Sequence, residues 1–152
     1  MRILCAIGDR RGAELVTRVA RFSRPGDELQ LLHVVDTGPR HPVNHLEGHL
    51  RPPHPPREEL NAAEQEAGEA MLKEALEAAS MSGLSAATRL ERGRPEQVVV
   101  SLARETGVDL VVVLGRENPR SHPLQGPPSV GHTARFIVDH APVDVLLIRE
   151  RP

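Results

Sequence analysis

The segment GRPEQVVVSLARETGVDLVVVLG, residues 93–115, contains the clearest succession of a helix and a strand in the chain. Pro95 stands at the first position of the predicted helix, where a backbone N–H would have no intrahelical acceptor, and Gly107 follows the helix end. One apolar face of this helix consists of Val98, Val99, Leu102 and Ala103. The aliphatic run at 108–115 then predicts a central strand buried on both faces. A helix that leads into such a strand is typical of α/β proteins.

The same alternation extends toward both ends of the chain. Further aliphatic runs of strand length lie at residues 2–8, 28–36, 84–91 and 143–148. Apolar residues recur at helical spacing at Leu15, Val16, Val19 and Ala20, then at Leu60, Ala63, Ala67, Met71 and Ala75, beside Leu72, Leu76 and Ala79, and again within 133–141. These patterns predict an α/β fold, a single open sheet of five parallel strands flanked by helices on both faces. Ligands bind such sheets beyond the carboxyl ends of the strands, where Gly8, Asp9, Val35, Asp36, Gly115 and Arg116 lie.

The composition favours one domain over residues 1–152 and disfavours several kinds of partner. The formal net charge is -2, from 19 basic and 21 acidic residues, so there is no surplus of cations for nucleic acid. Cys5 is the only cysteine, which excludes a disulfide within the chain and suits the reducing cytoplasm. No segment approaches the eighteen or so apolar residues of a membrane span. We therefore expect a soluble, cytoplasmic protein that contacts neither nucleic acid nor membrane.

Residues 37–57 form a Pro- and His-rich insertion without sustained periodicity, with six prolines and four histidines. His41, His45 and His49 are four residues apart, a spacing that would place their imidazoles on one helix face as metal ligands. Prolines and a glycine within the segment argue against a stable helix, and such a tract is more typical of a polar surface loop. We predict no metal site, with these histidines as the weak candidates.

Several local motifs resemble one known family. LLHVVD at 31–36, RGRPEQVVVSLARETGVDLVVVLG at 92–115 and DHAPVDVLLI at 139–148 are similar to successive motifs of the universal stress protein family. The resemblance spans nearly the whole chain apart from the insertion. It implies a Rossmann-like sheet with strand order 3-2-1-4-5, related to that of the adenine nucleotide alpha hydrolases, and a homodimer formed through the last strand, residues 143–148.

Many members of this family bind ATP through a loop of the form G-x2-G-x9-G-[ST], which joins the fourth strand to the last helix. This sequence keeps part of the motif, at Gly115, Arg116, Asn118, Gly131, His132 and Thr133. Gly115 and Gly131 are 16 positions apart, three more than in the motif, and Asn118 stands in place of the second glycine. His132 replaces the hydroxyl residue, although Thr133 follows it. The resemblance therefore implies a degenerate ATP site, with Mg²⁺ bound only together with ATP.

The resemblance also implies residues for the adenosine end of the nucleotide. The family's first strand commonly ends in an Asp, whereas here Gly8 precedes Asp9, so the carboxylate is displaced by one residue. Val34 and Val35 occupy the region where backbone groups of the family read the adenine edge. Backbone contacts do not depend on side-chain identity, so this part of the site is the least altered.

These observations predict a universal stress protein-like protein that acts by binding in a stress response or in signalling, with no catalytic residues. Cys5 and His33 lie within predicted strands and are interpreted as a small buried hydrophobe and a core or edge histidine. One alternative is a protein-interaction module without nucleotide, acting through residues 37–57. A slow ATP hydrolase, with Asp9 and Asp36 as its acids, is the least favoured alternative.

Overall fold

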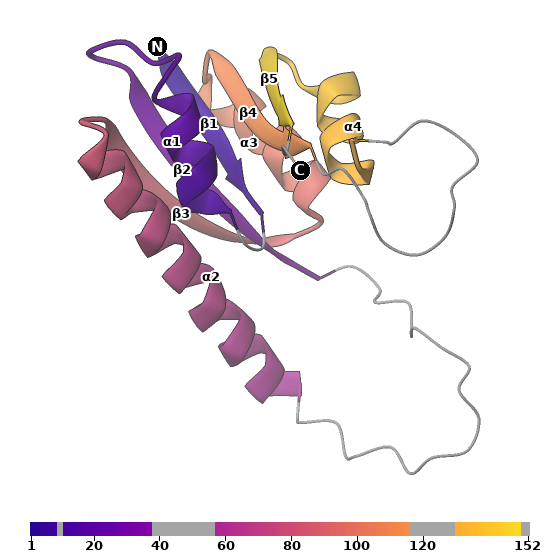
Figure 1. Cartoon of the computed structure of the whole chain (residues 1–152). Coiled ribbons are helices and arrows are strands. Elements are labelled where there is room, and N and C mark those ends of the chain that lie inside the picture. The colour runs from indigo at the N-terminus through magenta and orange to yellow at the C-terminus, as the bar shows by residue number, and fades with distance from the viewer. Residues whose placement is uncertain (9–10, 38–56, 116–129, 150–152) are drawn as a thin grey trace, which may run out of the picture.

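Strands and helices alternate along the computed structural model, which describes residues 1–8, 11–37, 57–115 and 130–149 (Figure 1). The strands are β1 (Arg2–Ile7), β2 (Glu28–Asp36), β3 (Ser85–Gly93), β4 (Leu110–Gly115) and β5 (Asp144–Arg149). The helices are α1 (Gly12–Val19), α2 (Arg57–Met81), α3 (Pro95–Thr106) and α4 (His132–His140). The helix predicted from residue 95 is confirmed, and Gly107 closes it in the left-handed conformation with φ 57°.

All five strands are parallel, in the order β3-β2-β1-β4-β5, which confirms the predicted sheet and its order. The prediction that 108–115 forms the central strand is wrong, because β1 holds that position. β4 is nevertheless an interior strand, since β1 and β5 pair with its two edges. Its three valines, Val111, Val112 and Val113, are buried. A continuous apolar run thus predicts a strand that is buried on both faces. Every interior strand has this property, so the run does not show which strand is central.

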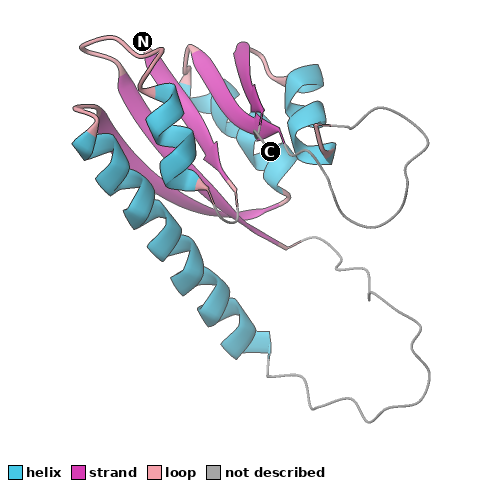
Figure 2. Cartoon of the chain, viewed as in Figure 1, coloured by secondary structure: helices cyan, strands magenta, loops and turns pink. Residues whose placement is uncertain are grey.

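The helices cover both faces of the sheet (Figure 2). On one face, α1 and α2 pack over the alternate residues Ile3, Cys5 and Ile7 of β1. On the other face, α3 and α4 pack over Leu4 of β1 and Leu32 of β2. Two apolar cores result, one on each side of the sheet, built almost entirely from aliphatic side chains.

The long helix α2 contacts the sheet through only part of its length. Its buried positions are Gly68, Leu72, Ala75 and Ala79. Ala63 and Ala67, predicted on the buried face, are exposed, because the N-terminal part of the helix projects beyond the sheet (Figure 1). Arg92 of β3 binds this part, donating from Nη2 to the Asn61 carbonyl oxygen at 3.2 Å and to Oε1 of Gln65 at 3.3 Å.

The structure describes one residue at each end of the predicted insertion, 37–57. The Thr37 N–H donates to the Gly93 carbonyl oxygen at 3.1 Å, so residue 37 continues the edge of the sheet. Arg57 already belongs to α2. Residues 38–56, with the three candidate histidines, lie outside the described residues.

Candidate functional site

Strands β1 and β4 diverge at the carboxyl edge of the sheet. Their pairing ends at Ala6 and Val113. Beyond that point β1 continues beside β2 alone, to the pair Ile7–His33. Meanwhile β4 continues beside β5, to the pair Gly115–Arg149. The crossovers from β1 and from β4 leave in opposite directions here, and ligands of open parallel sheets bind at such a point.

Helices α1, α3 and α4 begin at this same edge, because each follows the carboxyl end of a strand, whereas α2 begins beyond the sheet. The first N–H groups of a helix have no intrahelical acceptor, and the helix dipole adds partial positive charge there. This edge of the sheet therefore favours anionic ligands over cationic ones.

Gly8 follows β1 directly and is exposed. A Cβ atom at this position would meet no atom within 4 Å. The backbone is thus open to a ligand on the side where a side chain would stand. Asp9, the predicted carboxylate neighbour, lies outside the described residues.

The end of β2 presents backbone more than side chains. Val35 is buried, and Val34 packs against the core beneath α3 and α4 on the opposite face of the sheet. The Val34 side chain thus packs against a core and the Val35 side chain is buried, which leaves the peptide groups as the parts that a ligand beyond the strand end would meet. Asp36, the last residue of β2, is exposed.

Gly115 and Gly131 lie close together, but the structure gives them different physical reasons to be glycine. A Cβ atom at position 115 would lie 3.1 Å from Cδ1 of Leu147 and 3.3 Å from Cβ of Val130, so packing against β5 and the chain before α4 restricts this site. Gly131 is the N-cap of α4 with φ 91° and ψ 157°, a conformation that is essentially restricted to glycine. Arg116 and Asn118, predicted between them, lie outside the described residues.

His132 and Thr133 are the first two residues of α4. The His132 side chain is 81% exposed, and its Nε2 lies 3.8 Å from Oε1 of Glu96 in the first turn of α3. Glu96 itself is only 12% exposed. Glu96 was not predicted from the sequence as a site residue, although an acidic residue directly after Pro95, at a helix start on this edge, is a usable signal. The pair joins the starts of the two helices on this side of the sheet.

Two groups that the sequence analysis interpreted as structural are buried. His33 is 5% exposed, and its Nδ1 lies 3.1 Å from the carbonyl oxygen of Ile7. Cys5 is fully buried, and loss of solvation raises the pKa of its thiol to about 12. A thiol with that pKa stays protonated at neutral pH and is a poor nucleophile, as the interpretation as a small hydrophobe requires.

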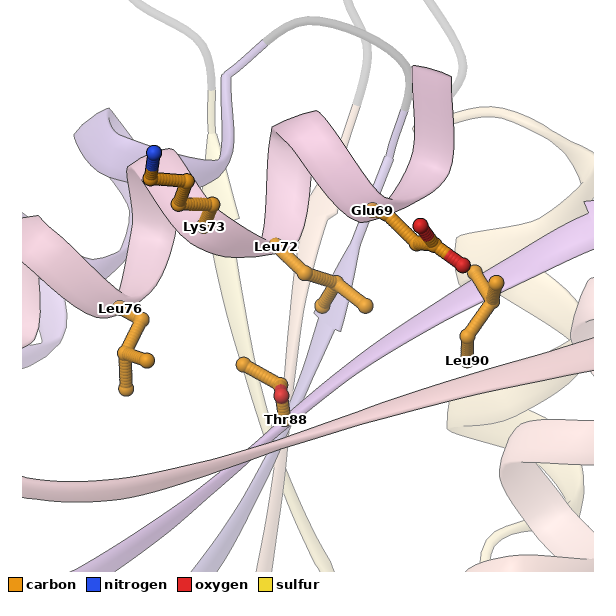
Figure 3. A pocket seen from close by; sticks show the side chains of 6 residues that line it. All are labelled: Glu69, Leu72, Lys73, Leu76, Thr88 and Leu90. Atoms are coloured by element: carbon orange, nitrogen blue, oxygen red, sulfur yellow. The ribbon is translucent and has the colours of Figure 1, made fainter. Parts of the chain in front are cut away.

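Two cavities formed by described residues lie away from this edge. One of about 240 Å³ lies between α2 and β3 (Figure 3), lined by Glu69, Leu72, Lys73, Leu76, Thr88 and Leu90. The other, of about 310 Å³, lies at the amino ends of the strands and includes Arg2 and Val108 in its lining. Neither cavity contains a predicted site residue.

Neither a metal cluster nor a membrane span is found in the part of the chain that the structure describes. No three His, Cys, Asp or Glu side chains lie together there as they would to hold a metal ion. No described helix is both long and apolar enough to cross a membrane. The weak metal candidates His41, His45 and His49 are not among these residues.

Comparisons with known proteins agree with the fold. The family model described as the universal stress protein family matches residues 1–149. A universal stress protein from Archaeoglobus fulgidus is 18% identical, with a TM-score of 0.72 over 97% of this chain and 98% of that one. UspA from Lactobacillus plantarum is 23% identical, with a TM-score of 0.64 over 98% and 97%. A family protein from Arabidopsis thaliana with AMP bound is 15% identical, with a TM-score of 0.66 over 99% and 92%. No protein with a curated description matches the chain significantly.

Proposed function

The chain belongs to the universal stress protein family, and we propose that it acts in a stress response by binding an adenine nucleotide at the carboxyl edge of its sheet. The observation that carries this proposal is the divergence of β1 and β4 directly beside the start of α4. The AMP bound to the Arabidopsis family protein supports the ligand class.

The adenosine end is assigned to the ends of β1 and β2. Gly8 leaves backbone open to solvent, and the peptide groups of Val34 and Val35 offer donors and acceptors to an adenine edge. Asp9 supplies a carboxylate for the ribose in this proposal.

The phosphates are assigned to the start of α4, where the helix dipole favours anions. Gly131, His132 and Thr133 provide its first backbone N–H groups. Gly115, Arg116 and Asn118 complete the proposed phosphate loop, and Mg²⁺ accompanies ATP when ATP is the ligand.

We further propose that the protein is a cytoplasmic homodimer. β5 is an edge strand with Val145, Leu146 and Leu147 half-buried, so a second copy beside it would cover apolar side chains and pair backbone groups. Sedimentation equilibrium measures this assembly directly, and a monomer at high concentration would contradict it.

Calorimetric titration with AMP, and with ATP and Mg²⁺, tests the nucleotide proposal. Substituting His132→Ser restores the hydroxyl of the family motif, and we expect it to bind ATP roughly tenfold to a hundredfold more tightly, the range of one added hydrogen bond to a charged group. His132→Ala is the matched control, because it removes the imidazole without adding a hydroxyl. Saturable binding of AMP by the unaltered protein is the expected result. The absence of both binding heat and a thermal shift at millimolar nucleotide would refute the proposal.

A further inference from the structure

The last carbonyl group of β1 is held by a side chain. Ile7 pairs with β2 but no longer with β4, since that ladder ends at Ala6. Nδ1 of His33 lies 3.1 Å from the Ile7 carbonyl oxygen. A carbonyl oxygen only accepts hydrogen bonds, so Nδ1 carries the proton and donates. The imidazole therefore fixes the backbone at the place where β1 leaves the sheet.

Close contacts hold this imidazole and Ile7 in place. A Cβ atom at Gly68 of α2 would lie 2.7 Å from Cδ2 and 3.3 Å from Nε2 of His33, so the helix backbone packs directly against the ring. A Cβ atom at Gly12 of α1 would lie 2.8 Å from Cγ2 of Ile7 and 3.3 Å from Cβ of Ala75. Both helices thus approach closely only because glycine stands at these two positions.

At the next residue, no described atom would contact a side chain. Gly8 is exposed, and the space where its side chain would stand is open. The direction of the chain at Gly8 is consequently set by the residue before it, and the Ile7 carbonyl belongs to the same peptide unit as the Gly8 N–H. Holding the carbonyl of that planar unit also holds the direction of the N–H.

We propose that His33 is a positioning residue for the candidate site. By donating from Nδ1 to Ile7, it orients the Ile7–Gly8 peptide unit at the carboxyl edge and so sets the backbone that meets the adenosine end of the ligand. The ligand part of this inference rests on the proposed nucleotide function. The effect on the Gly8 N–H is independent of any ligand.

Two variants of equal shape separate the hydrogen bond from the packing. In His33→Asn, the amide nitrogen replaces Nδ1 and can still donate to Ile7. In His33→Leu, the branched side chain has the same outline but no donor. Both variants lose the ring current of the imidazole, so they are compared with each other. We expect the Gly8 amide resonance of the nucleotide-free protein to move further in His33→Leu than in His33→Asn. AMP affinity should fall roughly fivefold to tenfold in His33→Leu, the range of one lost hydrogen bond, and less than twofold in His33→Asn.

A third variant displaces the imidazole without removing it. Gly68→Ala places a methyl group against the ring, and we expect the Gly8 resonance to shift in the same direction as in His33→Leu. Thermal unfolding of each variant shows whether it is folded at the temperature of measurement.

The outcomes separate the two proposals. Equal Gly8 shifts in the Asn and Leu variants would overturn the positioning role, because packing alone would then explain the contact. If the unaltered protein binds no AMP, the proposed function fails, and the Gly8 comparison still decides the role of His33 in orienting the strand end.

Discussion

Two histidines at the same edge of the sheet have opposite surroundings. His33, on the side covered by α1 and α2, is 5% exposed and enclosed by helix and strand backbone. His132, on the side covered by α3 and α4, is 81% exposed, and its Nε2 lies 3.8 Å from Oε1 of Glu96. The comparison indicates that one side of the edge is a fixed frame while the other presents groups to solvent. We therefore expect ligand selectivity to depend on residues of the α4 side, and the geometry of the site to depend on residues of the α1 and α2 side.

The largest expected effect on stability comes from the α4 side. Gly131→Ala forces a side chain into the backbone conformation with φ 91° and ψ 157°, and should lower the free energy of unfolding by about 2 kcal/mol. Urea unfolding measures this change. Gly8→Ala is the matched control, because a methyl group there meets open space and should change stability by less than about 0.5 kcal/mol. Equal losses in the two variants would show that the turn before α4 is not strained by a side chain.

A smaller loss is expected on the α1 side. Gly12→Ala places a methyl group 2.8 Å from Cγ2 of Ile7. Overpacking of this kind lowers the free energy of unfolding by roughly 1–3 kcal/mol. Alanine favours a helix over glycine by roughly 0.5–1 kcal/mol, so we expect a net loss of about 1 kcal/mol in the same urea experiment. A variant more stable than the unaltered protein would mean that α1 and Ile7 move apart at little cost, so that the α1 side is not rigid.

At neutral pH the smallest effect is that of Cys5, beneath α1, because its contribution to the pH dependence appears only in alkali. The thiol has its pKa raised to about 12 in the folded protein from a reference of 9.0, so the unfolded chain loses the proton first. The free energy of unfolding should thus be insensitive to this thiol below pH 9 and decrease as the pH rises from 9 toward 12. Urea unfolding across that range, with Cys5→Ala as the control that lacks this dependence, measures it. Rapid alkylation of Cys5 in the folded protein at neutral pH would contradict the sealed core.

Much of this architecture could be predicted from local sequence. Pro95 and Gly107 mark α3 because their backbone preferences act locally, and the aliphatic runs located every strand to within a few residues. Strand position within the sheet was harder, because β4 is as apolar as a central strand although β1 occupies the centre.

The parts of the site that escaped prediction depend on distant residues. The spacing of Gly115 and Gly131 indicated a degenerate loop, but only the fold reveals that Leu147 and Val130 crowd position 115. Glu96 and His132 approach each other only because α3 and α4 begin side by side at one edge. The buried face of α2 was assigned too far toward its start for the same reason, since periodicity does not show where the sheet beneath a helix ends.

The central position of β1 has a consequence for synthesis. β1 is made first and can pair with β2 soon afterwards, but its other neighbour, β4, is made only after α2, β3 and α3. On the ribosome, β1 is consequently an edge strand until β4 emerges, and its apolar side chains include Ile3, Leu4 and Cys5. Parallel pairing between such distant segments is slow, so the nascent chain carries an aggregation-prone edge until β4 pairs with β1.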